Sequence, residues 1–415
     1  METASKSALV VTEVRHSFPL KLRQPSLRQR TLDYVAWQQK RQAARANSLP
    51  IPEMPDGLLT SLNVDLTTAC NYRCTHCIDF DMLNGKAKYE YRELRDSIAS
   101  LQQKGLRSVI LIGGGEPTVH PQFEDMVAYL KKLGLQVAIV SNGSGNKRIL
   151  NIVDMLGEHD MVRLSLDSGS NERFVAMHKP VKPITLDEIC GWIPKMRERN
   201  SVSQIHYSFI IVWKGAEREE NASVIPNIDE MVMATERARQ YGFSHISFKP
   251  FLTRRPAGAE VVDSAAMEYF ERTLAEITNA IKEARAYETP AFKVIENTAL
   301  RVLQAGTADE WRRQPHTCHK QAFQGVLSPL GFFNCPAHRG VPKARIAGKD
   351  AFTEKEQQAT KKATAAMLER FDASRECAEV TCLYNGMNWM LENAIQGTLP
   401  PEELGEVPEF NDYFL

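Results

Sequence analysis

Short apolar segments alternate with longer amphipathic segments through the middle of the chain. Amphipathic segments of helical period lie near residues 90–104, 121–133, 145–157, 185–199 and 227–241. Six β-prone runs, mostly apolar along their whole length, lie at residues 59–67, 107–114, 135–142, 161–167, 204–212 and 244–250. Six strands alternating with helices predict an α/β fold whose parallel strands are buried on both faces. Turn residues follow the strands, so we expect an active site at their carboxyl ends.

The regular alternation stops after the sixth run. Helices are expected near residues 263–286 and 292–304, and a Lys- and Ala-rich helix at 353–371. Between them, residues 323–335 read as a β-hairpin with Pro329 and Gly331 at the turn. The pattern after the barrel therefore predicts a small α+β extension.

A leader precedes the first strand. It contains a cation-rich stretch of helical period at residues 26–46 and ends in a linker with three prolines. We expect this helix to dock on the protein surface. The changes in pattern divide the chain into the leader, a strand–helix unit, a helical connector and a C-terminal unit, at residues 1–57, 58–255, 256–310 and 311–415.

Composition narrows the class of function. Lys and Arg number 51 and Asp and Glu number 51, so the chain has no net field that would gather nucleic acid or an anionic membrane. We expect neither of these partners, and a small-molecule substrate fits better. The N-terminus lacks the apolar segment of a signal peptide, and no window reaches the ~18 apolar residues of a membrane span. These features predict a cytoplasmic protein.

The distribution of the eight cysteines indicates two sites. Cys70, Cys74 and Cys77 have the spacing C-x3-C-x2-C directly after the first predicted strand. A structural zinc site requires four protein ligands, whereas three thiolates on a four-iron cluster leave one iron without a protein ligand. His76 could complete a zinc site only from a strained position between two cysteines. Cys190 stands alone in a predicted apolar helix and is expected to be a core residue.

Over residues 59–250 the sequence resembles the radical S-adenosylmethionine (SAM) superfamily, and the three cysteines match its loop position for position. The resemblance implies a partial parallel (β/α)6 TIM-like barrel. It also implies a [4Fe–4S] cluster whose open iron binds SAM. One electron from the cluster cleaves SAM, and the 5′-deoxyadenosyl radical takes a hydrogen atom from the substrate. An electron donor such as a flavodoxin or ferredoxin would then be a partner.

Other parts of this family pattern occur in the expected order. GGGEP (113–117) ends the second strand, where the backbone of two glycines and the carboxylate of a glutamate would meet SAM. By itself the motif could be a strand-to-helix turn, and the polar residues that end the third and fourth strands could be helix N-caps. The cofactor-binding residues implied by the resemblance are His76, through its backbone, Gly114, Gly115, Glu116, Ser141, Asn142, Ser165 and Asp167.

The second set of cysteines comprises Cys318, Cys335, Cys377 and Cys382. Two separated pairs of thiolates can close an iron–sulfur cluster or a zinc tetrahedron, or the cysteines can be buried without a ligand. The segment 310–390 resembles the Twitch form of the SPASM extension, which implies one auxiliary [4Fe–4S] cluster. It departs from a full SPASM domain in having no cysteines for a second auxiliary cluster, and Gly331 lies one position closer to the second cysteine than usual. Four cysteine ligands would leave no iron free for substrate.

The function predicted from the sequence is a radical SAM oxidoreductase or related transformase that acts on a small metabolite. The specific expectation is a two-electron oxidation at an unactivated C–H bond, with the auxiliary cluster as acceptor of the second electron. One alternative is a SPASM-type maturase of a ribosomal peptide, and another is a non-catalytic iron–sulfur or zinc redox protein. Lys249, Trp213 and Lys214 end predicted strands and are candidates for substrate contact.

Overall fold

The computed structural model describes residues 17–218, 224–255, 258–262, 264, 267, 269–399 and 404–415. Its main element is one curved sheet with the strand order β12-β11-β10-β1-β2-β3-β4-β5-β6-β9. The six predicted strands are neighbours in it and all run parallel. They are β1 (Ser61–Val64), β2 (Ser108–Leu111), β3 (Gln136–Ser141), β4 (Met161–Ser165), β5 (Gln204–Ile211) and β6 (His245–Pro250).

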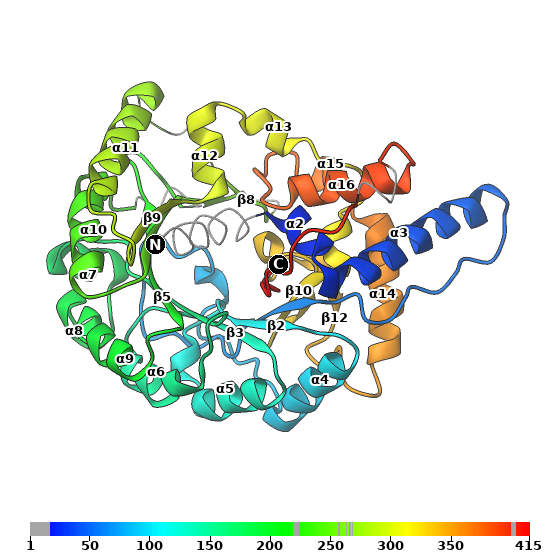
Figure 1. Ribbon diagram of the computed structural model, residues 1–415, viewed down its shortest axis with the longest axis horizontal. Helices are drawn as coiled ribbons and strands as arrows, with labels where there is room; N and C mark the ends of the chain where they lie inside the picture. The colour runs from blue at the N-terminus through cyan, green and yellow to red at the C-terminus, as the bar shows by residue number, and fades with distance from the viewer. Residues whose placement is uncertain are drawn as a thin grey trace.

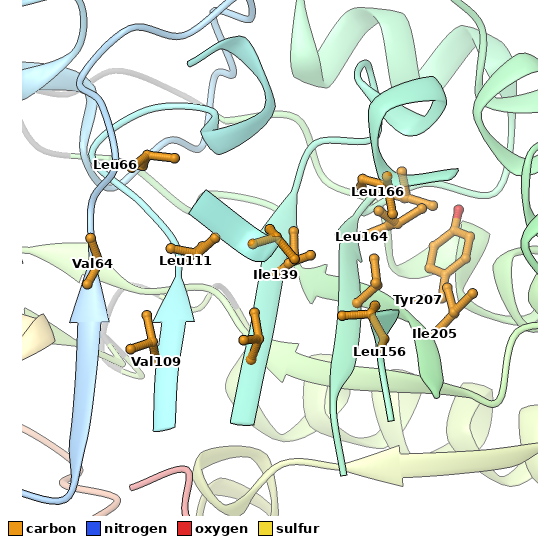
Figure 2. Close-up of a cluster of buried hydrophobic side chains, with 14 of the residues drawn as sticks. Val64, Leu66, Val109, Leu111, Ile139, Leu156, Leu164, Leu166, Ile205 and Tyr207 are labelled. Atoms are coloured by element: carbon orange, nitrogen blue, oxygen red, sulfur yellow. The ribbon is translucent and has the colours of Figure 1, made fainter. Parts of the chain in front are cut away.

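Helices cover the outer face of this sheet (Figure 1). Alternate strand residues point outward and pack beneath the helices, and Figure 2 shows Val64, Leu111 and Ile139 side by side on adjacent strands. All three are completely buried, as expected for a parallel sheet covered by helices. The covering helices are α4 (Tyr91–Gln103), α5 (Phe123–Lys132), α6 (Asn146–Ile152), α7 (Asn171–His178), α8 (Leu186–Cys190), α9 (Ile193–Arg199) and α10 (Met231–Gln240).

Two further parallel strands flank the predicted six. β9 (Lys293–Glu296) pairs with β6, and β10 (Gln324–Ser328) pairs with β1. The predicted hairpin at 323–335 is confirmed, because β10 pairs antiparallel with β11 (Gly331–Phe333). Its attachment to the barrel sheet was not predicted.

The prediction of a helix at 292–304 is partly wrong. Its first residues form β9, and α12 (Thr298–Ala305) begins after Asn297, whose side chain accepts a hydrogen bond from the N–H of Leu300. The segment taken as a purely helical connector therefore contains a strand of the main sheet. A run of four residues is too short for periodicity to separate a strand from a helix.

The remaining elements stand beside the open side of the barrel, and those beyond residue 340 lie next to the N-terminal helices (Figure 1). They include β12 (Arg345–Ala347) at the sheet edge and a small hairpin of β7 (Thr253–Arg254) and β8 (Glu260–Val261). The helices there are α12, α13 (Ala308–Arg312), α14 (Gln357–Arg370), α15 (Ala373–Glu376) and α16 (Asn385–Ile395). Helix α11 (Phe270–Arg285) instead continues the layer of covering helices, next to α10 and β9 (Figure 1).

The N-terminal helices α2 (Phe18–Arg23) and α3 (Pro25–Ala46) share a core with α16. Phe18, Leu22, Tyr34, Met387 and Leu391 are buried together there. The cation-rich stretch thus docks on the protein through its apolar face, as expected from its period. The first 16 residues of the predicted leader lie outside the described residues.

The end of the chain covers the amino ends of β2 and β3. The hydroxyl of Ser108 donates to the carbonyl of Tyr413, at 2.7 Å, and the N–H of Tyr413 donates to Gln136, at 3.0 Å. Lys21 on α2 donates to the carbonyl of Phe414, at 2.6 Å. The two ends of the described chain therefore meet at the amino side of the barrel, opposite the predicted site. Among the described residues, none of the helices has the length and apolar composition to span a membrane.

Candidate metal and cofactor site

One cavity of about 550 Å³ joins the two cysteine sets at the carboxyl ends of the barrel strands. All seven cysteines of the two sets line it. Predicted cofactor residues that also line it are His76, Gly115, Glu116, Ser141, Asn142, Ser165 and Asp167. The position of the site at the strand ends agrees with the expectation from the strand–helix order.

The first cysteine set lies in the loop after β1, and backbone hydrogen bonds fasten this loop to the end of α7. The N–H of Arg73 donates to the carbonyl of His178, at 3.1 Å, and that of Thr75 to the carbonyl of Met177, at 2.8 Å. The N–H of Cys70 donates to the side chain of Asn84, at 3.1 Å. The loop is thus held at both ends, which presents its three half-buried cysteines to the cavity.

His178 lies against Cys74, although the two residues are 104 positions apart in the sequence. Its Nδ1 is 3.3 Å from Sγ of Cys74, and its Nε2 is 2.9 Å from the carbonyl oxygen of Leu166. Burial lowers the pKa of His178 to about 4, so the ring is neutral at pH 7. Sequence reasoning did not single out His178 as a neighbour of the cysteines, since nothing local in the chain marks it.

The GGGEP turn packs directly on the cysteine loop. A Cβ atom on Gly115 would lie 2.4 Å from the carbonyl oxygen of Ala69, so only glycine fits there. The N–H of Glu116 donates to the same carbonyl, at 2.9 Å. Gly114 has a φ of +68°, which glycine adopts without strain. The motif therefore fixes the cysteine loop relative to β2.

The carboxylate of Glu116 is buried and accepts four hydrogen bonds. The donors are the N–H and hydroxyl of Thr118, at 3.0 and 2.6 Å, the hydroxyl of Ser141, at 2.8 Å, and the N–H of Asn142, at 2.7 Å. Burial raises the pKa of Glu116 even though these bonds oppose the shift. Three of the predicted cofactor residues are thus connected to one another, and the expected contact of Glu116 with the SAM ammonium group stays a prediction.

Asp167 connects the end of β4 to His76. Its Oδ2 lies 3.0 Å from Nε2 of His76, and its Oδ1 accepts from the N–H of Ile210, at 2.7 Å. Burial acts to raise the pKa of Asp167, but the contact with His76 and the hydrogen bond from Ile210 hold it below its usual value. Asp167 adopts a φ of +49°, which is unusual for a residue with a side chain. The ring of His76 is thereby fixed between two cysteine ligand candidates.

The second cysteine set converges from four separate elements. Cys318 precedes a short 3-10 turn, Cys335 follows β11, Cys377 follows α15 and Cys382 precedes α16. Burial raises the pKa of Cys318 to about 11, and the charge of Cys335 adds to that shift. Cys377 and Cys382 have raised pKa values for the same reason, burial first and then their neighbouring thiols. The structure therefore brings together the four cysteines that the sequence grouped.

A family profile described as the radical SAM superfamily matches residues 64–225. These residues form a radical SAM domain. The chain is 34% identical over 113 residues to an S-adenosylmethionine-dependent nucleotide dehydratase of Thermoplasmatales archaeon (strain ISO4-H5), covering 26% of this chain and 38% of that relative. It is 34% identical over 118 residues to a GTP 3′,8-cyclase of Chlorobaculum tepidum, covering 28% of this chain and 35% of that relative. The chain thus spans little more than a third of these relatives.

Solved structures share the fold of the radical SAM domain and its C-terminal extension. Histidine-tagged anSMEcpe with bound AdoMet superposes with a TM-score of 0.53 at 13% identity, covering 82% of this chain and 97% of that one. Streptococcus suis SuiB bound to S-adenosylmethionine has a TM-score of 0.51 at 12% identity, covering 74% of this chain and 68% of that one. The predicted fold, a mostly parallel TIM-like partial barrel with a C-terminal extension, is confirmed. The superfamily implies SAM and a [4Fe–4S] cluster as cofactors.

The donor set at the first site fits such a cluster. Burial raises the pKa of Cys77 to about 12 and also raises that of Cys74, and the neighbouring cysteine thiols add to the shift at both. Thiols of this kind bind as thiolates only when a metal replaces the proton, which the positive iron centres of a cluster do. Three cysteines without a fourth at this end of the cavity match the ligand set that the radical SAM domain requires.

The spacing of the sulfur atoms bears on the two metal alternatives at the second site. Among the described residues, His76, Asp167 and His178 form a group of possible metal ligands whose ligand atoms all lie within 4.8 Å of one another. No described cysteine belongs to a group of three that is this compact. Zn–S bonds of about 2.3 Å would place the sulfurs of a zinc site ~3.8 Å apart. No three sulfurs of the second set, whose four cysteines the structure describes, lie within 4.8 Å of one another.

Some candidate residues lie outside the cavity, and some residues that the sequence did not predict line it. Cys190 is completely buried in the barrel core, as expected. Trp213 is buried against Phe251 rather than lining the cavity, and Lys214 is not among the lining residues. Lys249 does line it. Sequence reasoning missed the charged lining residues Arg163, Asp79, Glu260 and Arg339.

Proposed function

We propose that this protein is a radical SAM enzyme with a [4Fe–4S] cluster at each cysteine set, and that it oxidises a small metabolite by two electrons. The observation that carries the proposal is the single cavity onto which both sets open. A substrate in that cavity lies between the first site, where SAM would bind, and the second site.

The two clusters divide the chemistry of this reaction. When loaded, the first supplies the electron that cleaves SAM to methionine and a 5′-deoxyadenosyl radical, and the second accepts the electron that remains on the substrate after hydrogen abstraction. The substrate thereby loses one hydrogen atom, one electron and one proton. Flavodoxin or ferredoxin is the proposed donor to the first site.

The residues of the chain hold this arrangement in place. Glu116 ties the GGGEP turn to the end of β3, and Gly115 permits that turn to contact the cysteine loop. Asp167 orients His76 within the loop, and His178 contacts Cys74. Glu116, Ser141, Asn142, Ser165 and Asp167 form the proposed wall of the SAM pocket, because these residues line the cavity beside the first set.

The absence of any three sulfurs within 4.8 Å of one another among the four described cysteines of the second set favours a cluster over zinc at that site. Four cysteine ligands fill the positions of a cluster, so we propose electron transfer rather than substrate binding there. His338 and Asn388 contact this set, with Nε2 of His338 3.6 Å from Sγ of Cys377 and Nδ2 of Asn388 3.9 Å from Sγ of Cys318.

A small metabolite fits the cavity better than a peptide does. The cavity of about 550 Å³ has to hold SAM and both clusters beside the substrate, which limits the size of the substrate. The described leader helices pack into a shared core with α16 and form no separate domain for recognising a peptide. The relatives named above act on nucleotides by their names, whereas a structure of SuiB is titled as bound to a precursor peptide.

The test is anaerobic reconstitution followed by iron and sulfide counting, together with a dithionite-driven assay for 5′-deoxyadenosine. We expect about eight irons in the wild type and about four in both Cys74→Ala and Cys335→Ala. Nucleoside formation should disappear in Cys74→Ala and persist in Cys335→Ala. The matched control Cys190→Ala should keep all its iron, because that thiol is buried away from the cavity.

Other outcomes separate the alternatives. A content of four irons and one zinc would support a radical SAM enzyme whose second site holds zinc. Such an enzyme has no auxiliary cluster to accept an electron. A protein that binds iron but forms no nucleoside would be a redox carrier. Deuterium transfer from a labelled precursor peptide into 5′-deoxyadenosine would identify a peptide maturase.

A further inference from the structure

A buried arginine connects the loops of the two cysteine sets. Arg339 lies four residues after Cys335, and Asp79 lies two residues after Cys77. Nη1 of Arg339 lies 3.1 and 2.9 Å from the two carboxylate oxygens of Asp79. Nε of Arg339 lies 3.0 Å from Oδ2 of Asp65, at the end of β1, as an ion pair without hydrogen-bond alignment. All three residues are less than a tenth exposed.

The first glycine of GGGEP provides the space for this contact. A Cβ atom on Gly113 would lie 2.6 Å from Nη1 of Arg339, so the guanidinium occupies the position of a missing side chain. The N–H of Gly114 also donates to Oδ2 of Asp79, at 3.3 Å. Asp79 therefore holds the GGGEP turn and Arg339 at the same time. Sequence reasoning assigned Gly114 and Gly115 to SAM and left Gly113 without a role.

The charges in this contact act on the first cysteine set. The Asp79 carboxylate lies two residues after Cys77, and both residues line the same cavity. A negative charge close to a cluster disfavours an added electron on that cluster. Arg339 offsets the charge of Asp79, and it enters from the loop that carries the second cysteine set.

We propose that Arg339 is a positioning residue that anchors the second cysteine loop to the first through Asp79, and that it sets the reduction potential of the first cluster by neutralising that carboxylate. The inference rests on the proposed cluster at Cys70, Cys74 and Cys77. It holds whether the second site contains iron or zinc.

The test compares Arg339→Met, Asp79→Asn and the double variant in the reconstituted protein. The readout is the midpoint potential of the cluster whose EPR signal changes when SAM is added. Arg339→Met should lower the potential, because Asp79 then keeps only the more distant Arg254, whose Nη2 lies 3.7 Å from its Oδ1. Asp79→Asn should raise it, because Arg339 then loses one of its two carboxylate partners and keeps Asp65, and the double variant should return toward the wild type. Arg345→Met is the matched control, since Arg345 is exposed and should leave the potential unchanged.

The opposite signs separate this role from simple structural support, which would change both single variants in the same direction. Equal signs, or no shift in either single variant, would overturn the proposal. If Arg339→Met fails to hold the first cluster, recovery of that iron in the double variant supports the charge-pair role, and a wild-type potential in Asp79→Asn overturns it. A wild type without a SAM-responsive signal would contradict the proposed function, and this inference would fall with it.

Discussion

The buried carboxylate of Glu116 shows how one residue organises several others. It accepts hydrogen bonds from Thr118, Ser141 and Asn142, and so joins the end of β2 to the end of β3. The resemblance to the radical SAM family implied that Glu116, Ser141 and Asn142 belong to one site, at the ends of two predicted strands. It did not indicate that they bond to one another, since that depends on the distance between two strand ends.

Glu116→Gln should therefore destabilise the site. The amide group of Gln replaces one acceptor oxygen with a donor, which faces either the N–H of Asn142 or the N–H of Thr118. An unsatisfied buried group costs about 1–3 kcal/mol. We expect the free energy of unfolding to fall by about that amount in a denaturant titration, and SAM binding to weaken by about tenfold in calorimetry. The exposed Glu310→Gln should stay within about 0.5 kcal/mol of wild type. Wild-type stability in Glu116→Gln would contradict this account.

At the scale of elements, the site depends on close contact between turns that follow neighbouring strands. The GGGEP turn after β2 touches the cysteine loop after β1 through the backbone, and that contact leaves no room for a Cβ atom on Gly115. Both turns belong to strands whose register is parallel and regular. The glycine is thus required by packing between two elements rather than by its own backbone angle.

Gly115→Ala should displace the cysteine loop and empty the first metal site. We expect the iron content after reconstitution to fall from about eight to about four, because the second set lies on other elements. Gly134→Ala is the control, since a Cβ there meets nothing within 4 Å. That variant should keep its iron and lose only about 1–2 kcal/mol of stability, from the left-handed backbone at position 134. Full iron in Gly115→Ala would show that the loop tolerates the contact.

At the scale of the whole molecule, the ends of the described chain close the amino side of the barrel. Lys21 on α2 is almost completely buried and pairs with Asp412, at 3.0 Å, as well as with the carbonyl of Phe414. The contacts of Lys21 with the C-terminal tail therefore stabilise the amino side of the barrel. Among the described residues, neither the N-terminal helices nor the tail contributes a lining residue to the cavity.

Lys21→Met should lower global stability without changing the metal sites. Removing one partner of a largely buried ion pair costs about 3 kcal/mol, and we expect that loss in the free energy of unfolding. Iron content should equal that of the wild type. The exposed pair of Lys361 and Asp56, at 2.8 Å, provides the comparison, and Lys361→Met should cost less than about 1 kcal/mol. Equal losses in the two variants would show that the chain ends contribute no more than a surface pair.

The sequence by itself determined the six parallel strands, their helices, the hairpin at 323–335 and the grouping of the cysteines. Each of these follows from local information. The period of the apolar residues indicates which residues are buried, and cysteines close together in the sequence indicate a shared metal site. The tertiary structure decided which distant segments meet. It placed β9 and β10 beside β6 and β1, His178 against Cys74 across 104 positions, and Arg339 against Asp79 across 260. Such contacts depend on how packed elements approach one another in space, and no local pattern encodes that distance.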